Sequence, residues 1–509
     1  MDAKTKVAVN TLILYAKILI SMLLSLVTVP IILRALGEND YGVYNLVAGV
    51  ISMLAFLNAS MSIASQRYLS VSKGEGHLEK LNKIFNVSIV MHFIVAGAVL
   101  IILEICFPFL FSGFLNIEPD RINAAKLVYQ FLVVSTFFSI ISVPMEAALN
   151  AEENMLSFSI INILSSVLKF CLALFLVKCP GDRLIIYGAG MLMITVITYI
   201  IYLTYVLLHY RGKYTLNLRL FDGTVMKGMF GFMGWNALGS FAMLGRNQGV
   251  AIIFNVFFGT VANAAYGIAN QVHGALQYFS STFQKAINPQ LMISEGMNSR
   301  DRLIRIAFIS SRVSVFVLSL FAVPLILEMP YVLKIWLHDV PDYTIGLCQL
   351  MLISSIIYQY SAGLMSSVQA VGKIKGYMIA MSVLILMTIP ISYVLLKVGL
   401  PIYTVMIVWA SIEAVSLAVR LYQASTIVGI SVPQFLKKVL LPTLIAILVS
   451  ASVALFVQRF MTQGFVRLVV VTLVFVAIYV VISWFKVFDS SEHAMVSNFL
   501  GKFRRKISK

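Results

Sequence analysis

Apolar residues form long, nearly uninterrupted runs along the whole chain, and short polar segments separate these runs. Most runs reach or exceed the roughly 20 residues that a helix needs to cross the hydrocarbon core of a bilayer. The pattern therefore predicts an all-α integral membrane protein with about fourteen transmembrane helices. We place them near residues 9–33, 41–66, 83–111, 122–149, 155–178, 184–208, 226–257, 262–287, 303–327, 344–370, 375–396, 401–426, 437–457 and 464–486.

Composition agrees with this pattern. Of the 509 residues, 60% are apolar and only 12% are charged, and the mean hydropathy is +0.93. Soluble proteins carry about 25% charged residues. The formal net charge of +17 would suggest nucleic acid as a partner in a soluble protein, but cytoplasmic loops of membrane proteins accumulate Lys and Arg. We therefore expect membrane lipids, and no nucleic acid, as partners.

The basic residues gather in alternate loops. One set of loops is rich in them, and the intervening loops are poor. The rich set contains Lys4, Lys6, Arg67, Lys73, Lys80, Lys83, Arg211, Lys213, Arg219, Lys227, Arg300, Arg302, Arg305, Lys373, Lys375, Lys437, Lys438 and the tail residues Lys502, Arg504, Arg505, Lys506 and Lys509. The positive-inside rule places this set, and with it both termini, in the cytoplasm.

Short segments recur at a nearly constant offset. The sequence YGVYN at 41–45 returns as YGIAN at 266–270, Glu75-Gly76 returns as Glu295-Gly296, and the segment before 152 resembles the segment before 371. The offsets lie between about 219 and 225, and each match joins helices of the same ordinal position in two sets of six.

Because six is an even number, the two copies have the same orientation in the membrane. Parallel repeats of this kind place the substrate between the halves. We predict two parallel six-helix lobes around a central cavity, at residues 1–210 and 211–430. Two further helices and a basic cytoplasmic tail follow at 431–509.

A few ionisable residues stand out inside the apolar spans, where each costs several kcal/mol unless it faces a cavity or a partner. They are Lys17, Glu104, Lys169, Arg246, Arg312 and Glu413. If Gly37 is aligned with Gly259, Lys17 and Arg246 fall about seven residues apart, and hence on roughly the same face of equivalent helices. We predict that both line the central cavity and bind an anion, such as a diphosphate.

The other four ionisable residues leave alternatives open. Lys169 and Arg312 are further candidates for substrate binding, although Lys169 could snorkel to the surface and Arg312 is within reach of the cytoplasmic side. Glu104 and Glu413 could couple transport to an ion, neutralise a cation, or lie solvated at a helix end.

A polar face adds a second candidate feature. Residues Asn270, Gln277, Ser281 and Gln284 fall on one side of the eighth predicted helix. Such a face could bind sugar hydroxyls, or it could make hydrogen bonds between helices of the bundle.

Several familiar sites are missing from the sequence. The chain has no Walker-type phosphate loop, no His-Glu-x-x-His zinc motif, and no pair of its four cysteines at metal-ligand or redox spacing. We expect no metal, no cofactor and no catalytic residue, and hence a transporter rather than an enzyme.

The order of the predicted helices and several short segments resemble a known family. Two six-helix lobes with two extra helices resemble the lipid-linked polysaccharide flippases of the multidrug/oligosaccharidyl-lipid/polysaccharide (MOP) exporter superfamily, in particular the bacterial O-antigen flippases, with a MATE-like fold. The segments that carry the resemblance are 34–44 (RALGENDYGVY), 66–69 (QRYL), 266–272 (YGIANQV), 286–290 (AINPQ), 333–337 (LKIWL) and 369–374 (QAVGKI).

The resemblance implies movement of an undecaprenyl-diphosphate-linked oligosaccharide across the bacterial cytoplasmic (inner) membrane by alternating access, coupled to an ion gradient. It also implies a polysaccharide polymerase and a chain-length regulator as partners. Cavity cations serve the anionic carrier in this family, and Lys17 and Arg246 are the matching residues. The related lipid II flippases carry an Arg in helix 8, where this chain has polar residues and His273, which argues against lipid II as the substrate.

Two alternatives stay open. A multidrug and toxin exporter of the MATE type would share the fold but would favour an acidic cavity for cationic drugs. A membrane-embedded polysaccharide polymerase is disfavoured by the repeat and the short loops.

Overall fold

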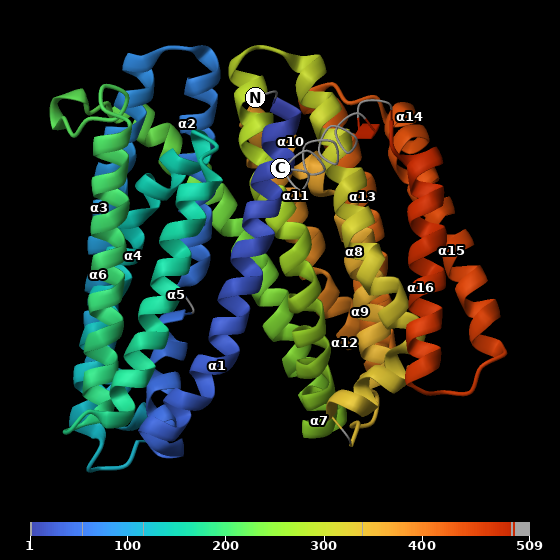
Figure 1. Ribbon diagram of the computed structural model, residues 1–509, viewed down its shortest axis with the longest axis horizontal. Coiled ribbons are helices and arrows are strands. Elements are labelled where there is room, and N and C mark those ends of the chain that lie inside the picture. Colours follow the sequence, from blue (N-terminus) through green and yellow to red (C-terminus); the bar gives the residue numbers. More distant parts are fainter. Residues whose placement is uncertain (1–2, 53, 116, 338, 490–491, 494–509) are drawn as a thin grey trace, which may run out of the picture. The chain divides into compact units, whose positions relative to one another are not determined.

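The secondary structure of the described residues is entirely helical. The computed structural model (Figure 1) describes residues 3–52, 54–115, 117–337, 339–489 and 492–493. The helices are α1 (Ala3–Ser52), α2 (Ala55–Glu75), α3 (Leu78–Phe109), α4 (Ile122–Ala151), α5 (Met155–Lys178), α6 (Arg183–His209), α7 (Gly223–Gly296), α8 (Arg300–Leu337), α9 (Thr344–Gln359), α10 (Ala362–Val371), α11 (Lys375–Leu386), α12 (Thr388–Lys397), α13 (Thr404–Val428), α14 (Val432–Phe435), α15 (Leu441–Arg459) and α16 (Phe465–Ile482). Four short elements extend or join these helices. They are the π-helical turns η1 (Leu110–Phe114), η3 (Leu436–Leu440) and η4 (Ser483–Val487), and the 3-10 helix η2 (Leu218–Leu220).

These helices confirm the predicted fold class. Eleven of the described helices are long and apolar enough to cross a membrane, or twelve if the bent pair of α9 and α10, which meet at 43°, counts as one span. Non-helical backbone at Gly37 and Gly259 divides α1 and α7, which are 50 and 74 residues long, into two helices each. With these two breaks, the described helices agree with the fourteen spans expected from the sequence.

The backbone repeats as the sequence does. Gly37 (φ 79°, ψ 167°) and Gly259 (φ 76°, ψ −163°) have nearly the same conformation, in a region that essentially only glycine occupies. The two glycines are 222 residues apart, and the starts of α3 and α8 (78 and 300) and of α4 and α9 (122 and 344) differ by the same 222. The predicted internal repeat therefore extends to the helix boundaries.

Packing divides the chain into two compact units. Asn10–Ala237 form one unit, called the N-lobe here, and Leu238–Lys509 with Met1–Val9 form the other, called the C-lobe. This division follows packing and falls within α7, whereas the boundary expected at residue 210 follows the sequence repeat. Each lobe has its own buried apolar core, with Val128 and Tyr129 fully buried in the N-lobe and Phe254 and Val405 in the C-lobe.

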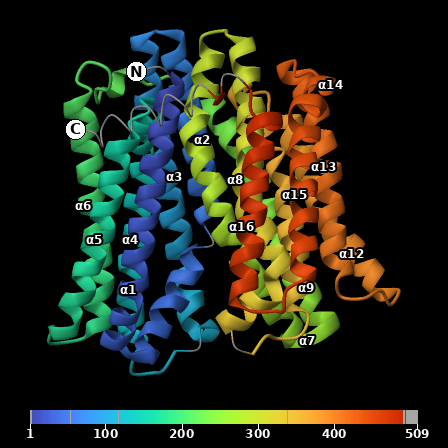
Figure 2. The ribbon, with the colours of Figure 1, turned by 45° about the vertical axis from the view of Figure 1, so that its right-hand side comes forward.

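The last two helices are an integral part of the C-lobe. Helices α15 and α16 pack on each other and on α8, as Figure 2 shows. Glu328 of α8 is fully buried. Its carboxylate accepts hydrogen bonds from Arg467 (2.9 Å) and Gln458 (3.0 Å). Midway along α8, Phe316 stacks on Tyr479 with ring centroids 5.2 Å apart.

The first half of α8 also contacts the chain just after α16. Arg312, which is 4% exposed, pairs with Asp489 at 2.9 Å and with Glu492 at 3.0 Å. Helix α8 thus contacts the terminal part of the chain through a carboxylate in its second half and a guanidinium in its first half. The expected basic tail, Lys502 to Lys509, lies outside the described residues.

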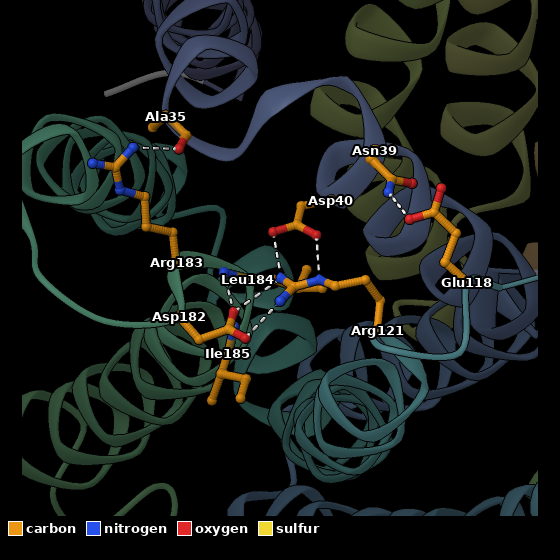
Figure 3. A network of polar contacts seen from close by, with 9 residues as sticks. All are labelled: Ala35, Asn39, Asp40, Glu118, Arg121, Asp182, Arg183, Leu184 and Ile185. Atoms are coloured by element: carbon orange, nitrogen blue, oxygen red, sulfur yellow. Dashed lines mark hydrogen bonds and ion pairs between the residues drawn. The ribbon is translucent and has the colours of Figure 1, made fainter.

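One arginine joins three connections of the N-lobe. Arg121, directly before α4, donates to Asp40 from Nε (2.7 Å) and to Asp182 from Nη1 (2.9 Å) and Nη2 (3.1 Å), as Figure 3 shows. Asp182 also caps α6, because its carboxylate accepts from the amides of Leu184 and Ile185. Next to it, Arg183 donates to the carbonyl of Ala35 at 2.9 Å. Three connections that are distant in sequence are held by this one guanidinium.

Replacing Arg121 with alanine is expected to lower the stability of the N-lobe by about 1–2 kcal/mol, because two partly buried carboxylates lose a charge-assisted partner. Thermal unfolding of the purified protein measures the change. The matched control is Arg34→Ala, an exposed arginine near the same connection, which should unfold like the wild type. Equal losses in both variants would contradict the role of Arg121.

The same network predicts a pH dependence. Burial raises the pKa of Asp182, but the hydrogen bonds and charge of Arg121 and two backbone amides outweigh burial and leave the pKa below its ordinary 3.8. An acid with a lowered folded-state pKa stabilises the fold above its unfolded pKa, and this contribution is lost as pH falls. Thermal stability should therefore drop below about pH 4, and the drop should be shallower in Asp182→Asn.

Candidate functional site

Two arginines and one glutamate form a buried charged cluster inside the C-lobe. Arg246 of α7 is 3% exposed and donates from Nη1 to Glu413 of α13 at 2.6 Å. Arg420, also on α13 and 2% exposed, lies with Nη1 at 3.8 Å from the other oxygen of Glu413. Arg246 and Glu413, which were both singled out from the sequence, thus lie in one site. We call Arg246, Glu413 and Arg420 the C-lobe cluster.

Helical spacing brings these groups together. Trp409, Glu413 and Arg420 are four and seven residues apart on α13, which places them on one face. Arg246 packs against this face, since its Cζ lies 3.8 Å from the centre of the Trp409 ring. Arg420 lies over Tyr358 at 5.1 Å. Each guanidinium therefore rests on an aromatic face, which attracts cations through its quadrupole.

The C-lobe cluster carries excess positive charge. Arginine stays protonated in proteins, so two guanidiniums face one carboxylate. Within the described residues, Arg246 Nε, Glu413 Oε2 and Arg420 Nη1 have no hydrogen-bond partner although they are buried. Buried polar atoms are normally hydrogen-bonded. Because the two guanidiniums are incompletely paired and outnumber the carboxylate, the cluster would attract an additional anion.

The predicted polar face of α7 lies beside the cluster. Gln359 of α9 donates to Gln277 at 2.8 Å and accepts from Gln284 at 3.2 Å. His273 and Ser355 are hydrogen-bonded at 2.6 Å. These contacts are hydrogen bonds between helices, one of the two roles considered from the sequence.

The two remaining residues of that face bond differently. Ser281 donates to the carbonyl of Tyr278 on its own helix at 3.0 Å. Asn270 lies one turn after Tyr266, whose hydroxyl donates to the carbonyl of Asn247 at 3.2 Å. The hydroxyl of Ser281 is therefore used locally in the described structure.

A small cavity adjoins the cluster. Its volume is about 90 Å³, the space of a few water molecules and well below the roughly 300–1,000 Å³ of a typical ligand pocket. It is lined by Met243, Arg246, His273, Gln277, Met351, Ser354, Ser355, Tyr358, Trp409 and Glu413. A cavity of this size admits one charged group, not a whole oligosaccharide.

The N-lobe holds the other predicted residues of the membrane interior. Lys17 on α1 is half-buried, and its Nζ lies 5.4 Å from the centre of the Phe158 ring on α5. Lys169 on α5 is exposed. Glu104 on α3 accepts a hydrogen bond from Gln130 at 3.2 Å.

Arg312 lies away from the C-lobe cluster. It lines a separate cavity near the start of α8, and this cavity and the smaller one share no lining residue in the described part of the chain. Its two carboxylate partners, Asp489 and Glu492, are 177 and 180 residues further along the chain.

Sequence reasoning missed three contributors to the cluster, namely Arg420, Trp409 and Tyr358. The signal for Arg420 was available: it lies two helical turns after Glu413 inside the same predicted span. No metal site is found in the residues that the structure describes, where no three His, Cys, Asp or Glu side chains gather.

One part of the chain matches a known protein family. Residues 14–175 match the family model described as MatE. This match covers about a third of the chain and lies within the N-lobe. A comparison with curated proteins gave no match.

Solved structures of MATE transporters share the fold of this chain. A MATE in the bent conformation is 14% identical with a TM-score of 0.75, covering 84% of this chain and 96% of its own. A multidrug resistance MATE family transporter of the MOP superfamily in an outward-facing conformation has a TM-score of 0.72, with the same identity and coverage. A MOP superfamily transporter from Pyrococcus furiosus, whose description reports reversed polarity of the binding pocket, also has 14% identity, a TM-score of 0.72 and the same coverage.

Both findings bear on the sequence predictions. The MATE-like fold is confirmed by the structures, and the match to the MatE model agrees with the expectation of a transporter. The protein is a multi-pass integral membrane protein.

Proposed function

We propose that this protein is a transporter of the MATE type and, within that type, a flippase that moves an undecaprenyl-diphosphate-linked oligosaccharide, such as an O-antigen unit, across the bacterial cytoplasmic membrane. The supporting observation is the C-lobe cluster, in which two buried guanidiniums outnumber one carboxylate. Such a site favours the diphosphate of the carrier over a cationic drug, because arginine binds phosphate through paired hydrogen bonds.

Each predicted residue has a role in this proposal. Arg246 binds the diphosphate in the C-lobe, and Lys17 offers a second cation in the N-lobe, with Lys169 and Arg312 as further candidates. Asn270, Gln277, Ser281 and Gln284 would contact sugar hydroxyls after exchanging their present hydrogen bonds. Glu413 and Glu104 are the candidates for ion coupling, and a polymerase and a chain-length regulator are the proposed partners.

The test follows surface polysaccharide in the native host after replacement of the chromosomal gene. Arg246→Met and Lys17→Met should each lower the rate of surface glycan export by about tenfold or more, because a lost charge-assisted contact is worth at least a factor of ten. Arg246→Lys should retain part of the activity, and Lys397→Ala, at the exposed last residue of α12, serves as the control.

Protein levels in the membrane must be measured in the same strains. Normal glycan at normal levels of the Arg246→Met protein would reject the role of the C-lobe cluster. Resistance to cationic drugs that depends on the gene, with unchanged glycan, would instead favour the multidrug exporter.

A further inference from the structure

A larger cavity opens in the C-lobe where α8 begins. Its volume is about 710 Å³, within the range of typical ligand pockets. Its charged lining consists of Asp301, Arg305 and Arg312 from α8, Lys438 from η3, and Asp489 after α16. The positive-inside rule predicts this end of the C-lobe to face the cytoplasm.

Helix α8 presents its cations along one face. Arg305 and Arg312 are seven residues, or two turns, apart and therefore on the same side of the helix. Arg305 is exposed, whereas Arg312 is 4% exposed at the inner end. Lys438 is exposed and enters the lining from a different segment. The three cations thus border the cavity from its exposed rim to its buried wall.

Arg312 is not fully satisfied by its protein partners. Its Nη2 holds both Asp489 and Glu492, whereas its buried Nε has no hydrogen-bond partner in the described residues. Burial raises the pKa of Glu492 to about 7, although Arg312 and the Asp489 amide act to lower it. Near neutral pH Glu492 is therefore only partly ionised, so Asp489 is the main negative partner of Arg312.

We propose that this cavity is a binding site for a phosphate group, with Arg312 as the buried anchor and Arg305 and Lys438 as the outer contacts. A phosphate offers several acceptor oxygens, which suits an arginine with an unused N–H and two further cations. The phosphate belongs either to the headgroup of an anionic lipid or to a soluble phosphate compound. The site is separate from the C-lobe cluster and does not depend on the flippase proposal.

The experiment uses the full-length protein in two settings. In detergent, thermal unfolding is followed while sodium phosphate is titrated, with sodium chloride at equal ionic strength as the reference. In nanodiscs of phosphatidylcholine with and without phosphatidylglycerol, native mass spectrometry counts the retained anionic lipid. The test variant is Arg305→Ala/Lys438→Ala, and the matched control is Lys373→Ala/Lys437→Ala, two exposed lysines outside the cavity.

The test variant should bind phosphate or phosphatidylglycerol at least tenfold more weakly than the wild type, because each charge-assisted contact contributes about a factor of ten to Kd. The control should bind like the wild type. Retention of phosphatidylglycerol alone identifies a lipid headgroup, and a response to phosphate alone identifies a soluble ligand. Absence of both responses, or an equal loss in the control, overturns the proposal.

Discussion

Replacing Glu413 with alanine is expected to destabilise the C-lobe by about 3–5 kcal/mol, the usual cost of leaving buried charges without a partner. Arg246 and Arg420 are 3% and 2% exposed and cannot turn to water without repacking the helices around them. Trp409 and Tyr358 would still face the guanidiniums but cannot neutralise them. Unfolding of the purified protein in increasing SDS measures the loss.

Two companion variants separate charge from packing. Glu413→Gln keeps the volume but removes the negative charge, so it should also be strongly destabilised. Arg246→Met/Glu413→Leu/Arg420→Met removes the whole cluster and should recover much of the stability, because apolar residues of similar size often replace a buried ion network at little cost. If the triple variant were less stable than Glu413→Ala, unpaired charge could not be the reason why Glu413→Ala is destabilised.

Replacing Gly363 with alanine is expected to cost about 3 kcal/mol or more, at the upper end of overpacking effects. A Cβ at this position would lie 1.8 Å from the carbonyl oxygen of Ala307 and 2.9 Å from the hydroxyl of Ser311. A backbone carbonyl in α8 cannot rotate away as a side chain does, so α8 and α10 would have to separate. The Gly363 amide would then also lose its 3.1 Å hydrogen bond to Ser311.

The matched control for this substitution is Gly376→Ala, where a Cβ would meet nothing within 4 Å. Gly376 lies in α11, so alanine should leave stability unchanged or raise it slightly through its higher helix propensity. Thermal unfolding of the two variants, side by side, checks the prediction. Similar melting temperatures for both would contradict the close approach of α8 and α10.

The sequence predicted those parts of the fold that depend on local pattern. Runs of apolar residues indicated the helices, and the recurring YG segments indicated a repeat whose helix starts now differ by 222 residues. The kinks at Gly37 and Gly259 were not distinguishable from loops, because α1 and α7 continue on both sides of a single glycine. Hydropathy reports where a helix passes through lipid and says little about where its axis bends.

The C-lobe cluster could be predicted from the sequence only in part, because helical spacing relates residues within one helix and not between helices. Buried charge at Arg246 and Glu413 followed from their place inside apolar spans, but their 2.6 Å contact joins residues 167 apart in sequence. The pairing of Arg312 with Asp489 and Glu492 could not be predicted either, because these carboxylates come after α16. Pairing between distant segments depends on tertiary packing, which periodicity within one helix does not encode.

The attachment of α15 and α16 to α8 has a practical consequence for measuring motion. Because Glu328 and Arg312 fix both ends of that attachment, a probe on the exposed face of α16 should keep a constant distance from one on α8 throughout transport. Leu473 lies near the middle of α16 and its side chain is exposed, so a spin label there would report on the C-lobe as a whole. The terminal helices would then provide labelling sites for spectroscopy that lie away from the proposed substrate-binding residues.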